Sequence, residues 1–172
     1  MKKLFYLFAL LIPLITIAQD EQSLKKEMLQ LKEDNVELNH RLDQLQKAVD
    51  DGLWFDKIKE YAYIDKVFMY GPAPAKVKNP TAMGAKNPVK FWSYVFVPKN
   101  IDLTKKHPLL VLVHGGVHGD FTTYHTHMVR EMMAQGYIVV APEYRGSTGY
   151  GKGFHDLIDY GGLENDDCDA SR

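Results

Sequence analysis

The chain has 172 residues, of which 45% are hydrophobic and 25% charged, a composition typical of one globular domain with an appendage. Its formal net charge is −1 and it has no long basic run, so the sequence predicts no nucleic-acid binding. The single cysteine, Cys168, excludes an intramolecular disulfide and a cysteine-rich zinc motif.

Residues 1–18 have the pattern of a bacterial-type secretory signal peptide. Lys2 and Lys3 precede an apolar run over residues 4–17, which the small residue Ala18 closes. The run is shorter than the roughly 20 residues of a membrane-spanning helix. We therefore expect cleavage after Ala18, export to the periplasm or out of the cell, and no stable membrane span. An uncleaved membrane anchor is the alternative.

Residues 20–51 are predicted to form a long amphipathic, coiled-coil helix. From residue 24 to residue 49, seam residues recur in alternating steps of four and three, so they lie along one side of the helix. A buried Asn, here Asn35, fixes register and oligomeric state in such a seam. A parallel homodimer is the first interpretation, and a helix that folds back on its own domain is the alternative. The seam consists of Leu24, Met28, Leu31, Asn35, Leu38, Leu42, Leu45 and Val49.

The helix is expected to stop near Gly52, because glycine often ends a helical pattern. Residues 52–89 are then predicted to be a connector made of a short helix, a strand and a loop rich in Pro and Gly. The domain proper is expected over residues 90–172. Its first segment, KFWSYVFVP at residues 90–98, is predicted to be a strand buried on both faces.

Two apolar runs, residues 109–113 and 137–141, follow this strand. Between them lies a helical segment, residues 124–135, which Gly136 closes. Two continuously apolar strands joined by a helix are typical of a parallel sheet covered by helices. The predicted fold class is therefore α/β.

Three ordered motifs accompany these elements: HPLLVLVHGG at residues 107–116, GYIVVAPEYRGSTGYGKGF at 136–154, and DYGGLENDD at 159–167. Together they resemble the catalytic domain of prolyl oligopeptidase family serine peptidases, with the acylaminoacyl-peptidase and dipeptidyl-peptidase branches nearest. The resemblance covers about half of the chain, from Lys90 onward. It implies the N-terminal part of an α/β-hydrolase fold, a peptide or ester substrate and no cofactor.

His114, Gly115 and Gly116 resemble the HGG oxyanion motif of α/β-hydrolases. Acyl transfer by a serine needs donors aimed at the oxygen that becomes negative, and glycines let backbone N–H groups approach it closely. By the resemblance, Gly116 donates its N–H, Gly115 shapes the turn, and His114 organises the loop through hydrogen bonds.

Residues 113–127 contain four of the chain's seven histidines, which raises the alternative of a zinc site. Such a site needs three or four converging ligands. His125 and His127 are two positions apart and would lie on different faces of a helix, and His118 is on a glycine-flanked loop. The sequence therefore predicts no metal, and these three histidines are expected to be incidental.

A second loop, residues 145–151, resembles the family's loop beside the active site. Arg145 is suited to a bidentate carboxylate partner that would lock the loop. Ser147 does not lie in a nucleophile elbow, because Arg145 stands where G-x-S-x-G requires glycine. The residues expected beside the active site are Arg145, Gly146, Ser147, Gly149, Tyr150 and Gly151.

No serine of the chain lies in G-x-S-x-G, so the catalytic Ser, Asp and His of the family are absent from these 172 residues. In the family the nucleophile follows the helix that begins here near Glu164. The sequence is therefore interpreted as an exported serine hydrolase cut short before its nucleophile and inactive as given. The alternative is a non-enzymatic coiled-coil interaction protein with a degenerate hydrolase domain.

Overall fold

The computed structural model describes residues 2–77, 79–102 and 104–169, with side chains from residue 20 onward. It forms two compact units, Met1–Asn39 and His40–Arg172. The predicted signal peptide involves Met1 and the side chains of residues 2–18, which lie outside this description. Within the part that is described, no helix is long and apolar enough to cross a membrane.

Helix α1 (Lys2–Ile58) supplies the first unit and the beginning of the second. The predicted stop near Gly52 is wrong, since the helix continues for six more residues. The reason is burial: Trp54 and Ile58 are fully enclosed. Enclosing two large apolar side chains outweighs the roughly 1 kcal/mol that a glycine costs inside a helix.

Four strands form one sheet in the order β1-β2-β4-β3: β1 (Ala62–Gly71), β2 (Val89–Pro98), β3 (Leu109–Val111) and β4 (Ile138–Pro142). Strand β2 pairs antiparallel with β1 and with β4, whereas β3 and β4 are parallel. The expected partial parallel sheet is therefore corrected to a mixed one. Parallel pairing requires a long crossover, and the segment that leads directly from β3 to β4 supplies one that contains a helix.

The strand predicted within the connector belongs to this sheet, because β1 pairs with β2 over ten residues. The strand predicted at residues 90–98 is confirmed as β2. Side chains on both of its faces are almost fully buried, with Phe91 on one face and Tyr94 and Phe96 on the other.

The strand–helix–strand unit is confirmed, with shorter strands than expected. After β3 come a 3-10 turn, η1 (Thr123–His125), and helix α2 (Thr126–Ala134). Gly136 follows with φ +79°, a left-handed conformation that glycine adopts without strain. Two short helices, α3 (Lys152–His155) and α4 (Leu163–Asp167), complete the second unit.

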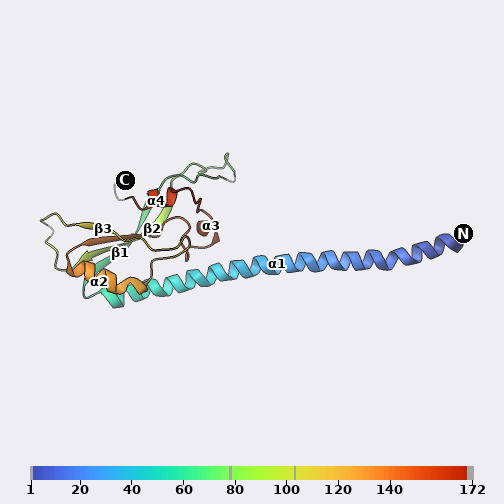
Figure 1. Ribbon diagram of the computed structural model, residues 1–172, viewed down its shortest axis with the longest axis horizontal. Helices are drawn as coiled ribbons and strands as arrows, with labels where there is room; N and C mark the ends of the chain where they lie inside the picture. Colours follow the sequence, from blue (N-terminus) through green and yellow to red (C-terminus); the bar gives the residue numbers. More distant parts are fainter. Residues whose placement is uncertain (1, 78, 103, 170–172) are drawn as a thin grey trace. The chain divides into compact units, whose positions relative to one another are not determined.

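The core of the second unit lies between the sheet and two helices, α2 and the last turns of α1, which lie side by side next to the strands in Figure 1. Trp54 stacks on Phe121 with ring centroids 5.3 Å apart and planes within 6°. Buried aromatic pairs of this kind add about 0.5–1.5 kcal/mol to their burial. The core cluster is Trp54, Ile58, Ala62, Tyr94, Phe96, Phe121, Val129, Met133, Val139 and Ala141.

Candidate active-site loops

Two loops meet at one edge of the sheet because they follow the parallel strands β3 and β4. The carboxyl ends of parallel strands lie at the same edge, where ligands of α/β proteins bind. We call residues 112–122 the HGG loop and residues 143–151 the RGS loop. They contain all nine residues that the sequence placed in or beside an active site.

The HGG loop buries its histidine and exposes its glycines. His114 is 4% exposed, whereas Gly115 and Gly116 are open to solvent. The left-handed conformation lies at Gly116, with φ +77°, and not at Gly115, which was expected to shape the turn. In the described part of the chain, the backbone N–H of Gly116 donates to no protein acceptor. It is therefore available to a ligand.

His114 joins the HGG loop to the RGS loop. Its Nε2 lies 2.9 Å from the Ser147 hydroxyl, and its ring stacks on Tyr144 at 4.3 Å. Because Ser147 donates its only hydroxyl hydrogen to the Tyr144 carbonyl, 2.6 Å away, we assign the ring proton to Nε2 of His114. Burial lowers the pKa of His114 to about 4, so the ring is neutral at pH 7.

Ser147 is fully buried, and its hydroxyl is occupied by these two hydrogen bonds. An attacking serine has to present its oxygen to the substrate next to a base oriented by a third group. Ser147 instead connects the HGG loop to the RGS loop through its hydroxyl. This agrees with the absence of an elbow motif around it.

Arg145 has the bidentate carboxylate partner that its residue type indicated. Its Nε and Nη2 donate to the two oxygens of Asp167 over 2.8 and 2.7 Å, and Nη2 also donates to the Pro72 carbonyl. The backbone N–H of Arg145 adds a third bond to Asp167. Both side chains are completely buried, so α4 and the RGS loop are fixed to each other by a paired, hydrogen-bonded charge.

Further bonds connect the two loops directly. The Thr148 N–H donates to the Gly119 carbonyl over 3.0 Å, and the Tyr144 hydroxyl donates to the Gly116 carbonyl over 2.5 Å. His118 was expected to be incidental, which is wrong. Its Nδ1 lies 2.8 Å from the Gly146 carbonyl, so the ring bridges the loops.

Lys47, on helix α1, reaches beneath both loops, and sequence reasoning missed it. Its side chain is only 2% exposed, and its Nζ bonds to the carboxylate of Glu143 and to the Phe121 carbonyl. Asp120 lies 3.5 Å from the same ammonium group. In the heptad pattern Lys47 occupies an outward position and looks like an ordinary surface lysine. Its spacing of seven residues from Trp54 is the one signal that could have indicated a second buried face.

Glu143, the first residue of the RGS loop, is the carboxylate partner of Lys47. It is completely buried, accepts hydrogen bonds from the Phe121 N–H, and lies 3.4 Å from His114 Nε2. Burial raises its pKa to about 7, against the opposing effect of Lys47. Lys47, Glu143 and His114 thus form one chain of contacts from α1 to the HGG loop.

Helix α1 makes two more polar contacts near the loops. Asp50 accepts from the backbone N–H and the hydroxyl of Thr123, over 2.9 and 2.6 Å, and so fixes the end of the HGG loop. Asp51 binds Lys66 of β1 at 2.5 Å and accepts from the Tyr94 hydroxyl.

Tyr150 of the RGS loop packs against the same cluster. Its ring lies 5.1 Å from the Lys66 ammonium and 5.9 Å from that of Lys47. The last glycines of the loop touch α1 as well: a side chain at Gly149 would meet Lys47 at 2.8 Å, and one at Gly151 would meet Gln44 at 3.1 Å. This part of the predicted site therefore packs against α1.

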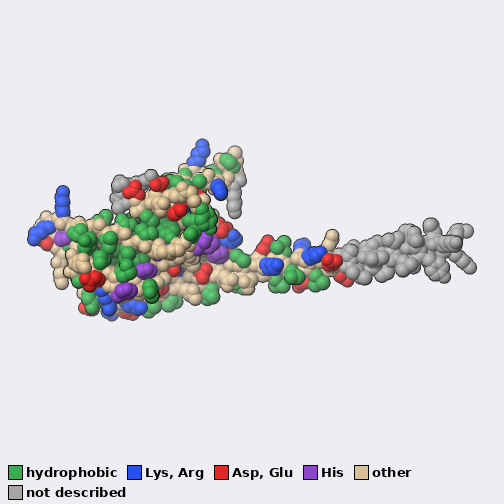
Figure 2. All heavy atoms as spheres, viewed as in Figure 1, with side chains coloured by type: hydrophobic (Ala, Val, Ile, Leu, Met, Phe, Trp, Pro, Cys, Tyr) green, Lys and Arg blue, Asp and Glu red, His purple; other side chains and the backbone are tan. Residues whose placement is uncertain are grey.

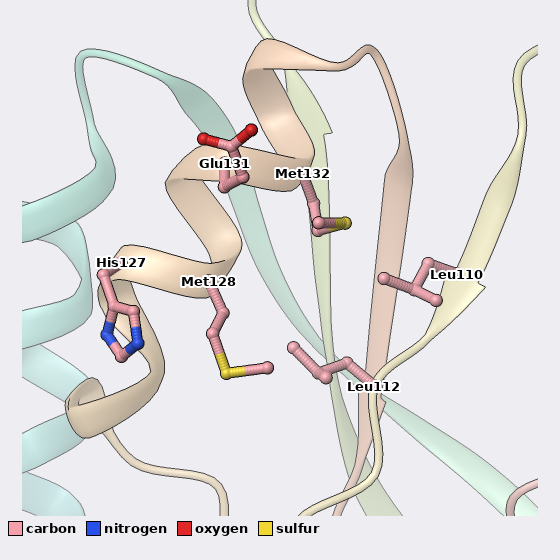
Figure 3. A pocket seen from close by; sticks show the side chains of 6 residues that line it. All are labelled: Leu110, Leu112, His127, Met128, Glu131 and Met132. Carbon is pink, nitrogen blue, oxygen red and sulfur yellow. The ribbon is translucent and has the colours of Figure 1, made fainter.

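The remaining histidines of the run lie apart. His125 stacks on Phe121, while His127 lines a separate hollow of about 360 Å³ between α2 and the edge of β3 (Figure 3). That hollow is mainly apolar, with Met and Leu side chains facing one another across it. Among the described residues, no group of three or more His, Cys, Asp or Glu side chains could hold a metal ion.

The second unit is similar to known peptidases in sequence. Residues 123–170 match the family model described as "Prolyl oligopeptidase family". Dipeptidyl-peptidase 5 of Aspergillus fumigatus is 40% identical over 79 residues, which are 44% of this chain and 11% of the relative. Dipeptidyl-peptidase 5 of Schizosaccharomyces pombe is 40% identical over 74 residues, 41% of this chain and 11% of the relative. The chain therefore spans about a tenth of the length of these relatives.

Two solved structures of peptidases are also similar to parts of the chain. The acylaminoacyl peptidase of Pyrococcus horikoshii is 25% identical, with a TM-score of 0.43, over 67% of this chain and 16% of that chain. A puromycin-hydrolyzing peptidase of Mycobacterium tuberculosis is 24% identical, with a TM-score of 0.36, over 47% and 12% of the two chains.

Proposed function

We propose that the HGG loop of the second unit, whose residues 123–170 match the prolyl oligopeptidase family model, is the oxyanion side of a serine-hydrolase active site. The substrate class is a peptide or acyl-peptide, and the fold is the N-terminal part of an α/β-hydrolase. The nucleophile, acid and base of the triad lie outside these 172 residues. The named relatives are peptidases, which does not favour the non-enzymatic alternative.

The observation that carries the proposal is the exposed, unpartnered N–H of Gly116 at the carboxyl end of β3. A tetrahedral intermediate of acyl transfer needs such a donor, fixed in place before the reaction. The HGG loop is fixed from below by the His114–Ser147 bond and from the side by Tyr144. The donor therefore undergoes little reorganisation when charge develops on the substrate oxygen.

His114 supports this arrangement in its neutral form. Burial keeps the ring uncharged at pH 7, and its Nε2–H is directed at Ser147. The chain's own contribution to catalysis is thus positioning and electrostatic stabilisation, not proton transfer.

The test is an atomic deletion of the donor in the protein encoded by the gene read past codon 172. Replacing the amide of Gly116 by an ester removes the N–H and leaves the shape of the loop. We expect kcat on a peptide anilide to fall about 10²–10³-fold, the usual loss for one oxyanion donor. The same replacement at Gly84, in the exposed loop before β2, should change kcat little.

Fluorophosphonate labelling provides a second readout. The 172-residue chain should stay unlabelled, and the longer protein should be labelled at a serine within G-x-S-x-G. A longer reading frame without such a serine, or equal kcat for the Gly116 and Gly84 esters, would overturn the proposal.

Export is a separate proposal, supported by the Lys2-Lys3 pair and the short apolar run that follows. N-terminal sequencing of the protein recovered from the periplasm or medium should begin at Gln19. Recovery of a chain that begins at residue 1, in the membrane fraction, would favour the uncleaved anchor instead.

A further inference from the structure

The seam of α1, the eight residues named above from Leu24 to Val49, is open to solvent. Its seven apolar side chains are each 52–66% exposed. Figure 2 shows hydrophobic side chains on the surface of this helix. Contiguous apolar surface of this kind marks an interaction site, since isolated exposed apolar residues do not repeat in register.

The second unit does not use the seam to hold its own part of the helix. Over residues 40–58 the buried side chains are those of Lys47, Trp54 and Ile58, none of which belongs to the seam. Lys47 is two residues beyond Leu45, which places it about 200° around the helix. Leu45 and Val49 therefore face away from the domain. This argues against the alternative in which the seam folds back on it.

We propose that the seam binds the seam of a second copy of this chain in a parallel, in-register, two-stranded coiled coil. Leu at every d position, together with one polar a position, is a pattern compatible with a two-stranded coil. The occupant is a second copy because the pattern is self-complementary, as the next two features show.

Asn35 favours a parallel over an antiparallel pair of helices. In a parallel, in-register pair, position a meets position a, so the two Asn35 amides lie opposite each other and can exchange a hydrogen bond. In an antiparallel pair, Asn35 would face a leucine d position, and its amide would be buried without a partner across the seam. An unsatisfied buried polar group costs about 1–3 kcal/mol.

Charges beside the seam agree with the same register. In a parallel coil each g position faces the following e position of the partner helix. Glu27 would face Lys32, and Asp20 would face Lys25, both pairs of opposite sign. The two later pairs, Asp34 with Asn39 and Arg41 with Gln46, bring no like charges together.

Dimerisation leaves the candidate active-site loops intact, since Lys47 lies on the opposite side of α1 from the seam. Each domain would be attached to the coil by a helix whose other face supports its own HGG and RGS loops. The proposal involves no catalytic residue, so it stands or fails independently of the proposed function.

The first experiment is the mass of the full chain in solution by light scattering, compared between two matched variants. Leu38 belongs to the seam and Leu29 does not, yet their exposed fractions are 60% and 59%. The unmodified chain and Leu29→Glu should both have twice the chain mass, and Leu38→Glu should have the mass of one chain. Circular dichroism should show the domain folded in all three. A monomeric unmodified chain, or equal effects of the two variants, would overturn the proposal.

The second experiment tests direction and register. In a Cys168→Ser background, Leu24→Cys should give a disulfide-linked dimer on mild oxidation, because both copies of residue 24 meet only when the helices are parallel. Failure to cross-link in a chain of dimeric mass would overturn the parallel arrangement. Asn35→Val should retain association but populate species larger than the dimer. A strictly dimeric variant would show that Asn35 does not specify the state.

Discussion

Over residues 40–58, helix α1 has one face in the domain and another in solvent, and the two faces do not follow a simple rule of apolar side chains inside and polar ones outside. The enclosed face carries Lys47 and Asp51 beside Trp54 and Ile58. The exposed face carries leucine and valine of the seam. A polar side chain can be buried where it finds charged partners, and an apolar one can remain exposed where its partner is another molecule.

The largest expected effect comes from removing a large buried side chain from the enclosed face. Trp54→Ala removes a fully buried indole that stacks on Phe121, so the free energy of unfolding should fall by about 3–5 kcal/mol. Phe55, the next residue, is 58% exposed, and Phe55→Ala should change stability by no more than about 0.5 kcal/mol. Urea unfolding of both variants measures the difference; similar losses would mean that the two faces are not distinct.

Lys47→Met removes the charge pair of the same face. The free energy of unfolding should fall by about 3 kcal/mol at pH 8, because the buried Glu143 is left without its cation. The loss should shrink below pH 7, where Glu143 takes up a proton. Adding Glu143→Gln should recover most of the stability at pH 8. Lys26→Met, at the equivalent heptad position of the exposed part of α1, is the control and should be neutral. A loss independent of pH would contradict the charge pairing.

His114 and Glu143 contribute to stability with opposite dependence on pH. Burial lowers the pKa of His114 from 6.5 to about 4, so its contribution to stability is present above pH 6.5 and is lost as the pH falls toward 4. Burial raises the pKa of Glu143 from 4.5 to about 7, so its contribution has the opposite slope and is lost as the pH rises from 4.5 to 7. The two slopes oppose each other between pH 4.5 and 6.5.

Removing the titration of Glu143 should reveal the pH dependence of stability that comes from His114. Glu143→Gln should lose about 3 kcal/mol more stability than Glu143→Gln/His114→Asn when the pH is lowered from 7 to 4. Urea unfolding at several pH values gives this difference. Parallel curves for the two variants would show that His114 is not held neutral.

The smallest expected effect tests the continuity of α1 between its exposed and enclosed parts. Gly52 lies inside the helix with no atom near the place of a side chain, so Gly52→Ala should raise stability by about 0.5–1 kcal/mol. Gly84, with φ +87°, should respond in the opposite direction to the same substitution. Thermal unfolding of the two variants distinguishes a continuous helix from one that ends near residue 51, where alanine would give no gain.

Much of the fold could be read from local pattern. The strand–helix–strand unit, the closing Gly136 and the strand at residues 90–98 follow from periodicity and turn chemistry, which act over a few residues. The end of α1 and the direction of β2 could not be read in this way. The first depends on a pocket that Trp54 fills from a distance, and the second depends on which strands become neighbours in the sheet.

For the candidate site, the sequence alone determined the two glycine-bearing loops and the resemblance that gives them a function, because close backbone approach requires glycine at fixed spacing. Only the tertiary structure decided what supports them. Lys47 and Glu143 are 96 positions apart in the sequence, and neither lies in a sequence pattern that predicts a buried ion pair. A buried charge is tolerable only with its partner, and that partner exists only once α1 has packed beneath the sheet.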